Sequence, residues 1–146
     1  MLSAYVDGCC APISPGGTAS YGVVVFKDSE KLWQDSGIVG SGDKMSNNVS
    51  EYQALYKLFE WLDKQPVEDI TIYSDSQLLV NQMSRKWKVK SGLYLPYYEQ
   101  CVIWMMQNID LWGDRIKFEW IPREMNLEAD ELSKKELLKR CIEVRW

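Results

Sequence analysis

Residues 51–62 read EYQALYKLFEWL, and they mark a change in the periodicity of the chain. The large apolar side chains of this stretch recur at helical spacing, at Tyr52, Leu55, Phe59 and Leu62. This spacing predicts an amphipathic helix that ends before Pro66. The residues before it favour strands. The stretch therefore separates an all-strand part of the chain from a part in which helices and strands alternate.

Strands and helices can be assigned on both sides of this helix. Three strands are expected before it, at residues 2–7, 21–26 and 30–39, with a turn over residues 9–19. Their short connections favour an antiparallel meander. After it, strands are expected at 69–74 and 115–121, helices at 77–83, 94–109 and 127–140, and a turn at 110–114. The order βββαβααβα predicts an α/β fold, a five-stranded mixed sheet flanked by helices, in a single domain over residues 1–146 with a short tail at 139–146.

The composition excludes several kinds of chemistry. The chain has 146 residues, a net charge of −4 and no histidine, which removes Ser-His-Asp triads, His-ligated zinc and His general bases. No run of about 18 apolar residues predicts a transmembrane helix, and the first residues do not resemble a secretion signal. We therefore expect a cytoplasmic protein whose four cysteines are reduced.

Four acidic residues each fall at the boundary of an expected element, and they are Asp7, Glu51, Asp75 and Asp130. Each one has a plain structural interpretation. Asp7 before Gly8 suits a turn, and Asp75 suits the N-cap of a helix. Glu51 suits a capping box with Asn48 as N-cap, and Asp130 complements a helix dipole. Taken singly, none of them except Glu51 favours a functional role.

Together the four acids favour a metal site. Glu51 shares a helical face with Leu55, so its carboxylate points toward the sheet, where an unpaired charge is costly. If the strands of Asp7 and Asp75 are parallel neighbours, both acids emerge at the same sheet edge. Converging carboxylates repel one another unless cations bind, and oxygen ligands suit Mg²⁺ or Mn²⁺. Two such ions about 4 Å apart can activate water and stabilise the leaving oxygen of a phosphodiester.

Four segments of the chain resemble type 1 ribonuclease H. They are residues 5–8 (YVDG), 46–55 (SNNVSEYQAL), 73–77 (YSDSQ) and 121–133 (IPREMNLEADELS). The resemblance runs in order from residue 2 to about residue 138, and the segments are specific together, although no single one is. It implies a ribonuclease H-like fold and an endonuclease that hydrolyses the RNA strand of RNA–DNA hybrids, leaving 5′-phosphate and 3′-hydroxyl ends.

The resemblance also implies roles for the four acids. The cofactor would be two Mg²⁺ ions, with Mn²⁺ as a substitute. Asp7 would contact both ions, Glu51 and Asp75 would complete the position that activates water, and Asp130 would complete the position beside the leaving group. We expect a monomer whose partner is the hybrid, with no membrane and no obligate protein partner.

Substrate contacts follow from the same resemblance, with some departures. Asn47 and Gln77 match positions that read 2′-hydroxyls or base edges, and Asn48 is a polar neighbour. Ser14 stands where members often carry asparagine, which weakens one expected RNA contact.

The loop before the last helix also departs from the family pattern. Many members carry a histidine there that assists turnover, whereas this chain has Arg123 and Glu124. We expect slower product release, or a substitute role for one of these two residues, without loss of the chemistry. The extended basic protrusion of some members is missing as well.

Positive charge is concentrated between residues 76 and 98, where no acidic residue occurs. Arg85, Lys86, Lys88 and Lys90 surround Trp87. We expect a channel for the DNA strand, with lysines on phosphates and the indole against a sugar or base. A solvated loop anchored by the tryptophan is the alternative.

Two other functions are alternatives to the endonuclease. A 3′–5′ exonuclease on the same fold expects the pattern Asp-x-Glu, but residue 9 is cysteine. A catalytically weak hybrid-binding module would be expected to lack some of the acids, and all four are present.

Overall fold

A five-stranded sheet forms the centre of the structure, a computed structural model that describes residues 1–85 and 88–144. Its strands are β1 (Leu2–Ala11), β2 (Thr18–Lys27), β3 (Glu30–Ser41), β4 (Ile70–Ser74) and β5 (Ile116–Trp120). β1, β2 and β3 form the expected antiparallel meander, while β4 pairs parallel with both β1 and β5. The order across the sheet is β3-β2-β1-β4-β5, so the predicted mixed sheet is confirmed.

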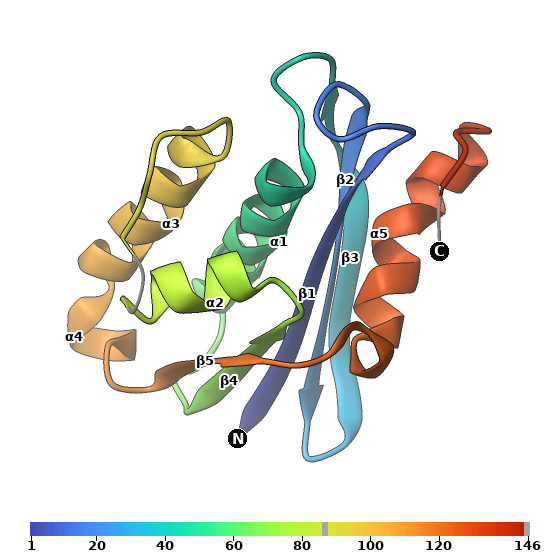
Figure 1. Ribbon diagram of the computed structural model, residues 1–146. Helices are drawn as coiled ribbons and strands as arrows, with labels where there is room; N and C mark the ends of the chain where they lie inside the picture. Colours follow the sequence, from blue (N-terminus) through green and yellow to red (C-terminus); the bar gives the residue numbers. More distant parts are fainter. Residues whose placement is uncertain (86–87, 145–146) are drawn as a thin grey trace.

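Helices cover both faces of this sheet. They are α1 (Asn47–Leu62), α2 (Gln77–Met83), α3 (Leu95–Gln107), α4 (Ile109–Trp112) and α5 (Leu127–Lys139), with a 3₁₀ turn η1 (Arg123–Met125) before α5. α1, α2 and α3 lie on one side of the sheet, and α5 lies on the other side, over the meander (Figure 1). Among the described residues, the helices are too short or too polar to cross a membrane.

Two of the sequence expectations were wrong about element boundaries. β1 continues through residues 9–11, which were expected to form a turn, because its ladder with β2 extends to the pair Ala11 and Thr18. Asp7 therefore lies inside a strand, although it is just beyond the last pair of the parallel β1–β4 ladder, Tyr5 with Tyr73. The expected turn at 110–114 is partly helical, since α4 adds one helical turn at Ile109–Trp112.

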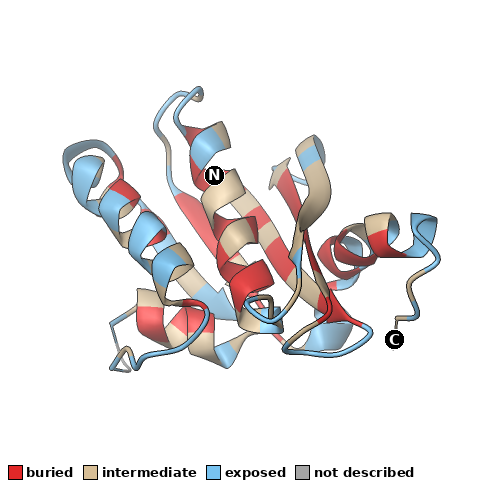
Figure 2. Cartoon of the chain, turned by 90° about the horizontal axis from the view of Figure 1, so that it is seen from above, coloured by how far each residue is buried: buried red, intermediate tan, exposed pale blue. Residues whose placement is uncertain are grey.

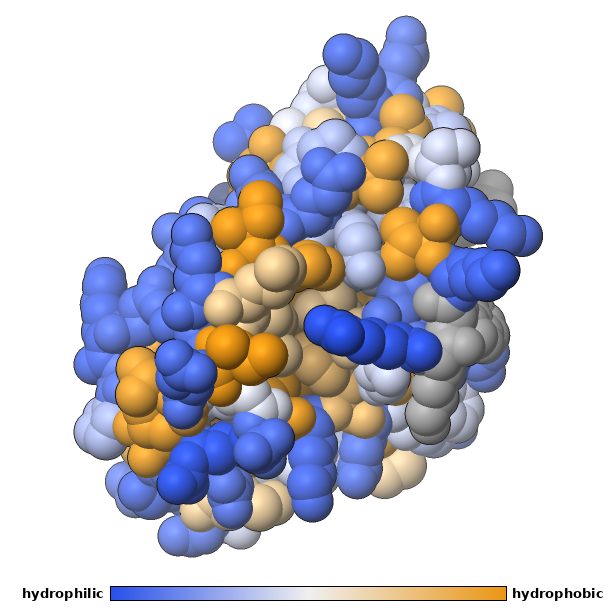
Figure 3. Space-filling view, turned by 90° about the vertical axis from the view of Figure 1, so that its left-hand side faces the viewer, coloured by the Kyte–Doolittle hydropathy of each residue, from blue (hydrophilic) through white to orange (hydrophobic). Residues whose placement is uncertain are grey.

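The core lies mainly between the sheet and α1. The apolar stripe of α1 is fully buried, including Leu55, Leu58 and Leu62. Burial follows the strands and the inward face of α1, as Figure 2 shows from above. The outer side of α3 and α4 is different, because it exposes large apolar side chains such as Ile103 and Met106 on an otherwise polar surface (Figure 3).

Two glycines allow the helices to approach the strands closely. A Cβ atom on Gly8 of β1 would lie 2.4 Å from the backbone nitrogen of Glu51 in α1. A Cβ atom on Gly22 of β2 would lie 2.4 Å from the backbone oxygen of Ala129 in α5. Gly22 is also the ladder partner of Asp7. The absence of these side chains therefore brings α1 and α5 to the same point of the sheet from opposite faces.

Candidate active site

Asp7 is the central acid of the site. It lies on β1, the middle strand, and its side chain is almost completely buried. The hydroxyl of Ser133 in α5 donates to Oδ2 of Asp7 at 3.5 Å. The neighbouring backbone is fixed as well, because Nδ2 of Asn126 donates to the carbonyl oxygen of Val6 at 3.0 Å. The strand and the start of α5 are thus held together on both sides of the carboxylate.

Glu51 projects from α1 toward the sheet, as expected from the apolar stripe. The capping-box interpretation with Asn48 was wrong, because the N-cap is Ser46, whose hydroxyl accepts from the backbone nitrogen of Val49. Glu51 is therefore in the second turn of the helix, where its carboxylate is not needed for capping. Its Oε2 atom is buried and has no hydrogen-bond partner within the described part of the chain.

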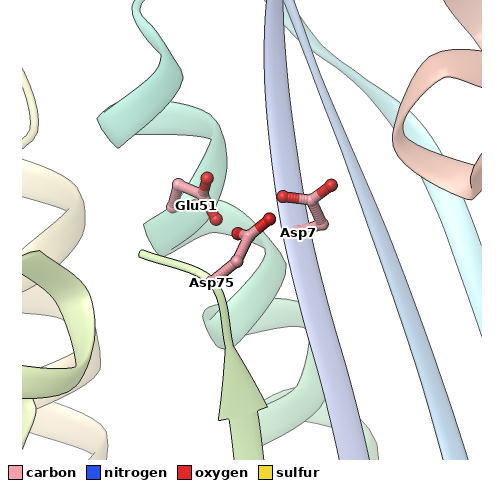
Figure 4. A group of neighbouring side chains, drawn as sticks. All are labelled: Asp7, Glu51 and Asp75. Carbon is pink, nitrogen blue, oxygen red and sulfur yellow. The ribbon is translucent and has the colours of Figure 1, made fainter. Parts of the chain in front are cut away.

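Asp75 follows the end of β4 directly, next to Asp7 on the neighbouring strand. The N-cap interpretation was wrong here too, because Ser76 caps α2 by accepting from the backbone nitrogen of Leu79 at 3.1 Å. The carboxylates of Asp7, Glu51 and Asp75 face one another (Figure 4), and each offers an oxygen within 4.8 Å of the other two. Three elements distant in sequence thus meet as one acidic group, here called the three-acid group.

Asp130 approaches this group from α5. Its Oδ1 atom is 2.6 Å from the ammonium of Lys134, one helical turn later, and 3.7 Å from the guanidinium of Arg123. Asn126 occupies the N-cap position of this helix, but its side chain bonds to β1 and makes no capping hydrogen bond. Asp130 is therefore an ion-paired acid at the edge of the three-acid group.

The electrostatics of the site reflect crowded carboxylates away from water. Burial raises the pKa of Asp7 well above its usual value, and the nearby Asp75 and Asp130 raise it further. Burial also raises the pKa of Glu51 strongly, with added repulsion from Asp7 and Asp75. The pKa of Asp75 is raised for the same first reason, and Arg123 partly opposes the shift. Each shift has burial as its largest cause, and repulsion between the neighbouring carboxylates adds to it.

The donor set fits a hard divalent cation. It consists of carboxylate oxygens only, which Mg²⁺ and Mn²⁺ prefer, and the buried Oε2 of Glu51 accepts no hydrogen bond from the described residues. The arrangement can therefore hold a cation that relieves the repulsion between Asp7, Glu51 and Asp75.

The acids open into a cavity of about 560 Å³ that all four share with Lys134. Three expected auxiliary residues also line it, and they are Ser14, Asn47 and Arg123. Oδ1 of Asn47 accepts from the backbone nitrogen of Cys10 at 2.8 Å, and the Ser14 hydroxyl accepts from the backbone nitrogen of Asn47 at 2.9 Å. These bonds fix the first turn of α1 against the end of β1 and the loop that follows it.

Other expected contact residues lie away from the cavity wall. Asn48 is half-buried and Gln77 is exposed in the first turn of its helix, and Glu124 lines a separate hollow behind η1. Lys88 and Lys90 are exposed. Lys86 and Trp87 lie outside the described residues. The contacts of these residues with a substrate stay predictions.

The described end of the basic segment (residues 85–90) is tied to the core at Lys90 by a hydrogen-bond network. Tyr94 donates its hydroxyl to the carbonyl oxygen of Lys90 at 2.9 Å, and it accepts from Nε2 of Gln82 at 2.9 Å. The other amide atom of Gln82 accepts from the buried hydroxyl of Tyr52 on α1. Exposed lysine side chains are thus carried by a backbone that is anchored to the helix of Glu51.

Two residues of the site were missed from the sequence. Lys134 is buried although lysines usually face water, and its only local signal is the spacing of four residues from Asp130. Trp120 lines the cavity, and its indole nitrogen donates to the backbone oxygen of Asp75 at 3.1 Å. The aromatic alternation of β5 gave no indication of that bond.

The chain is similar to proteins of known family over most of its length. Residues 6–136 match the protein family described as "Reverse transcriptase-like". A curated relative, "Bifunctional protein Rv2228c" of Mycobacterium tuberculosis, is 34% identical over 119 residues, which cover 80% of this chain and 30% of the relative. The chain thus spans about a third of that protein's length. The "Ribonuclease H" of Chlorobaculum parvum is 27% identical over 98% of this chain and 91% of its own.

A solved structure shares the fold closely. LC11-RNase H1, crystallised with an RNA/DNA hybrid, has a TM-score of 0.83 and 29% identity over 97% of this chain and 99% of its own.

Proposed function

The chain belongs to the type 1 ribonuclease H family, and from this we propose that it is an endonuclease that hydrolyses the RNA strand of RNA–DNA hybrids. The observation that carries the proposal is the three-acid group of Asp7, Glu51 and Asp75, with Asp130 beside it in one cavity. Mere structural acids would not be expected to converge from three elements with a buried oxygen left unpartnered. A related structure in complex with an RNA/DNA hybrid supports the choice of substrate.

The carboxylates would hold two divalent cations, Mg²⁺ in the first instance. Asp7 is close to both Asp75 and Asp130 and would help to hold both ions, while Glu51 and Asp75 would help to hold the first ion and Asp130 the second. When bound, the cations supply an activated water and stabilise the leaving oxygen of the phosphodiester. The residues of the chain contribute by fixing the oxygens before substrate arrives, because Asp7, Glu51 and Asp130 project from a strand and two helices, and Asp75 directly follows β4.

We propose that residues of the cavity wall and of the basic segment contact the substrate. The Nδ2 group of Asn47 remains available as a donor to a ribose hydroxyl, since its Oδ1 is already used by Cys10. Arg123, which is half-exposed beside Asp130, suits contact with the phosphate backbone or with the departing product. Gln77, Asn48, Lys88 and Lys90 are proposed as further contacts around this centre.

The proposal is tested by offering the purified protein four labelled substrates, namely hybrid, duplex DNA, duplex RNA and single strands. We expect cleavage of the RNA strand of the hybrid alone, with Mg²⁺ and not with EDTA, leaving 5′-phosphate ends. Asp7→Asn is expected to abolish cleavage while the circular dichroism spectrum is retained. Asp110→Asn, at an exposed acid of α4, is the matched control and should cleave normally. Full activity of a folded Asp7→Asn variant would refute the assignment.

A further inference from the structure

Lys134 is the buried cation of the active-site cavity. Its side chain is 2% exposed, and its ammonium is 2.6 Å from Oδ1 of Asp130. A lysine this deep needs an anionic partner, because removing an ammonium from water is costly. Both residues belong to α5, one turn apart, so the same backbone holds the ammonium against the carboxylate.

This ion pair makes the two ends of the acidic cluster unequal. The three-acid group offers oxygens within 4.8 Å of one another, including the unpartnered Oε2 of Glu51. Asp130 offers an oxygen that an ammonium already contacts. A cation that binds at the first end contacts the carboxylates of the three-acid group, whereas a cation that binds at the second end must displace the Lys134 ammonium, which is 2.6 Å from Asp130.

We propose that Lys134 is an internal counter-ion that competes with the second divalent cation for Asp130. The site then binds its cations with unequal affinity, the first at Asp7, Glu51 and Asp75, and the second only after the ammonium withdraws. The inference rests on the proposed function, because it takes the carboxylates to be cation ligands. It gives Lys134 a positioning role, since the lysine acts through Asp130.

The geometry explains why the Lys134 ammonium lies beside Asp130 and how it can move away. Without cations the cavity gathers four carboxylates, and Lys134 offsets part of that charge from inside. The lysine stem has four flexible carbons, so a small rotation carries the ammonium away from Asp130 while its backbone stays in α5. A substrate phosphate in the cavity adds negative charge, which favours exchange of the tethered monovalent charge for a divalent one.

The first test is calorimetric titration of Mn²⁺ into the substrate-free protein. We expect the wild-type protein to bind one ion well and the second more weakly. Lys134→Met, which keeps the apolar stem, is expected to tighten the second step by about tenfold or more, the scale of losing one close charge. Lys135→Met removes the same charge from an exposed position on the same helix and is the matched control. Lys134→Arg should restore the weak second step.

A second measurement uses the unmutated chain, so it stands even if Lys134→Met fails to fold. Nitrogen-15 spectra of the lysine ammonium groups are followed as Mg²⁺ is added, with the Lys134 signal identified by its loss in Lys134→Arg. We expect that signal to change in the second binding step and to stay fixed in the first. A signal that is unchanged at saturation, or that changes with the first ion, overturns the inference.

The outcomes separate this inference from the proposed function. Hybrid cleavage by the wild-type protein, together with an unchanged second step in folded Lys134→Met, overturns the role of Lys134 and leaves the nuclease assignment intact. A tightened second step in a protein that cleaves no hybrid supports the role of Lys134 and refutes the nuclease assignment. A wild-type protein that binds no Mn²⁺ overturns the inference outright.

Discussion

Replacing Gly22 by alanine is expected to displace Asp130 from the other acids without touching any of them. The new Cβ atom would lie 2.4 Å from the backbone oxygen of Ala129, 2.6 Å from the backbone nitrogen of Ser133 and 2.7 Å from Cβ of Leu132. None of these atoms is the flexible end of a side chain. Ordinary contact needs about 1 Å more, so α5 as a whole has to move away from β2.

The expected size of the effect follows from that displacement. Overpacking of this kind costs roughly 1–3 kcal/mol of folding free energy. For a chain of this length, each 1 kcal/mol lowers the melting temperature by about 2–4 °C. A misplacement of about 1 Å in a catalytic group can lower turnover by about 100-fold. The catalytic loss should therefore far exceed any loss of folded protein at 25 °C.

The assay compares Gly22→Ala with Gly40→Ala. The matched control adds the same methyl group to the edge strand β3, where the nearest atom is the flexible sulfur of Met45 at 3.2 Å. Turnover at saturating hybrid is measured beside thermal unfolding and hybrid binding. We expect a large fall in kcat for Gly22→Ala only, with binding of the hybrid retained. A folded Gly22→Ala protein with kcat within twofold of wild type would show that the fit of α5 on β2 does not position Asp130.

Three further outcomes are expected. Lys88→Ala combined with Lys90→Ala should weaken hybrid binding and reduce the slope of log affinity against log salt by about 1 for each lost phosphate contact, and an unchanged slope would exclude these two lysines from the channel. Gln82→Leu should lower the free energy of unfolding in urea by about 1–3 kcal/mol, because a buried tyrosine hydroxyl loses its partner, and an unchanged midpoint would contradict this. Burial raises the pKa of the Cys9 thiol to about 11, so it stays protonated near neutral pH, and alkylation followed by mass spectrometry should be slow at Cys9 up to pH 9 and fast at the exposed Cys141. Equal rates at the two cysteines would mean that the cavity wall opens readily.

Much of the fold could be predicted from periodicity. The strand pattern before residue 47 and the helical stripe through Leu55 both follow from which side chains must be buried. The extension of β1 to Ala11 could not be predicted, because prolines and glycines just beyond it favour a turn. Pairing with Thr18 decides that boundary, and pairing is a tertiary property.

Some features of the candidate site could be predicted from the sequence, and others could not. The convergence of Asp7 and Asp75 was expected on the condition that their strands are parallel neighbours, and the structure meets that condition. The burial of Lys134 does not, since a charged residue on a terminal helix is ordinarily solvated. The caps were also misassigned. Asp75 and Ser76 are both good capping residues, and so are Asn48 and Ser46, so only the backbone geometry chooses between the members of each pair.

β1, the middle strand of the sheet, precedes in the chain both strands that pair with it. Leu2 of β1 cannot pair with Ile70 of β4 until residue 70 has been synthesised. The four acids extend from Asp7 to Asp130, so they can meet only after residue 130 has been synthesised. Domains made at about 5–20 residues per second pass through such incomplete stages for seconds. A nascent chain therefore carries a half-paired β1 that exposes backbone donors and acceptors, and any nuclease activity arises only when the last helix docks.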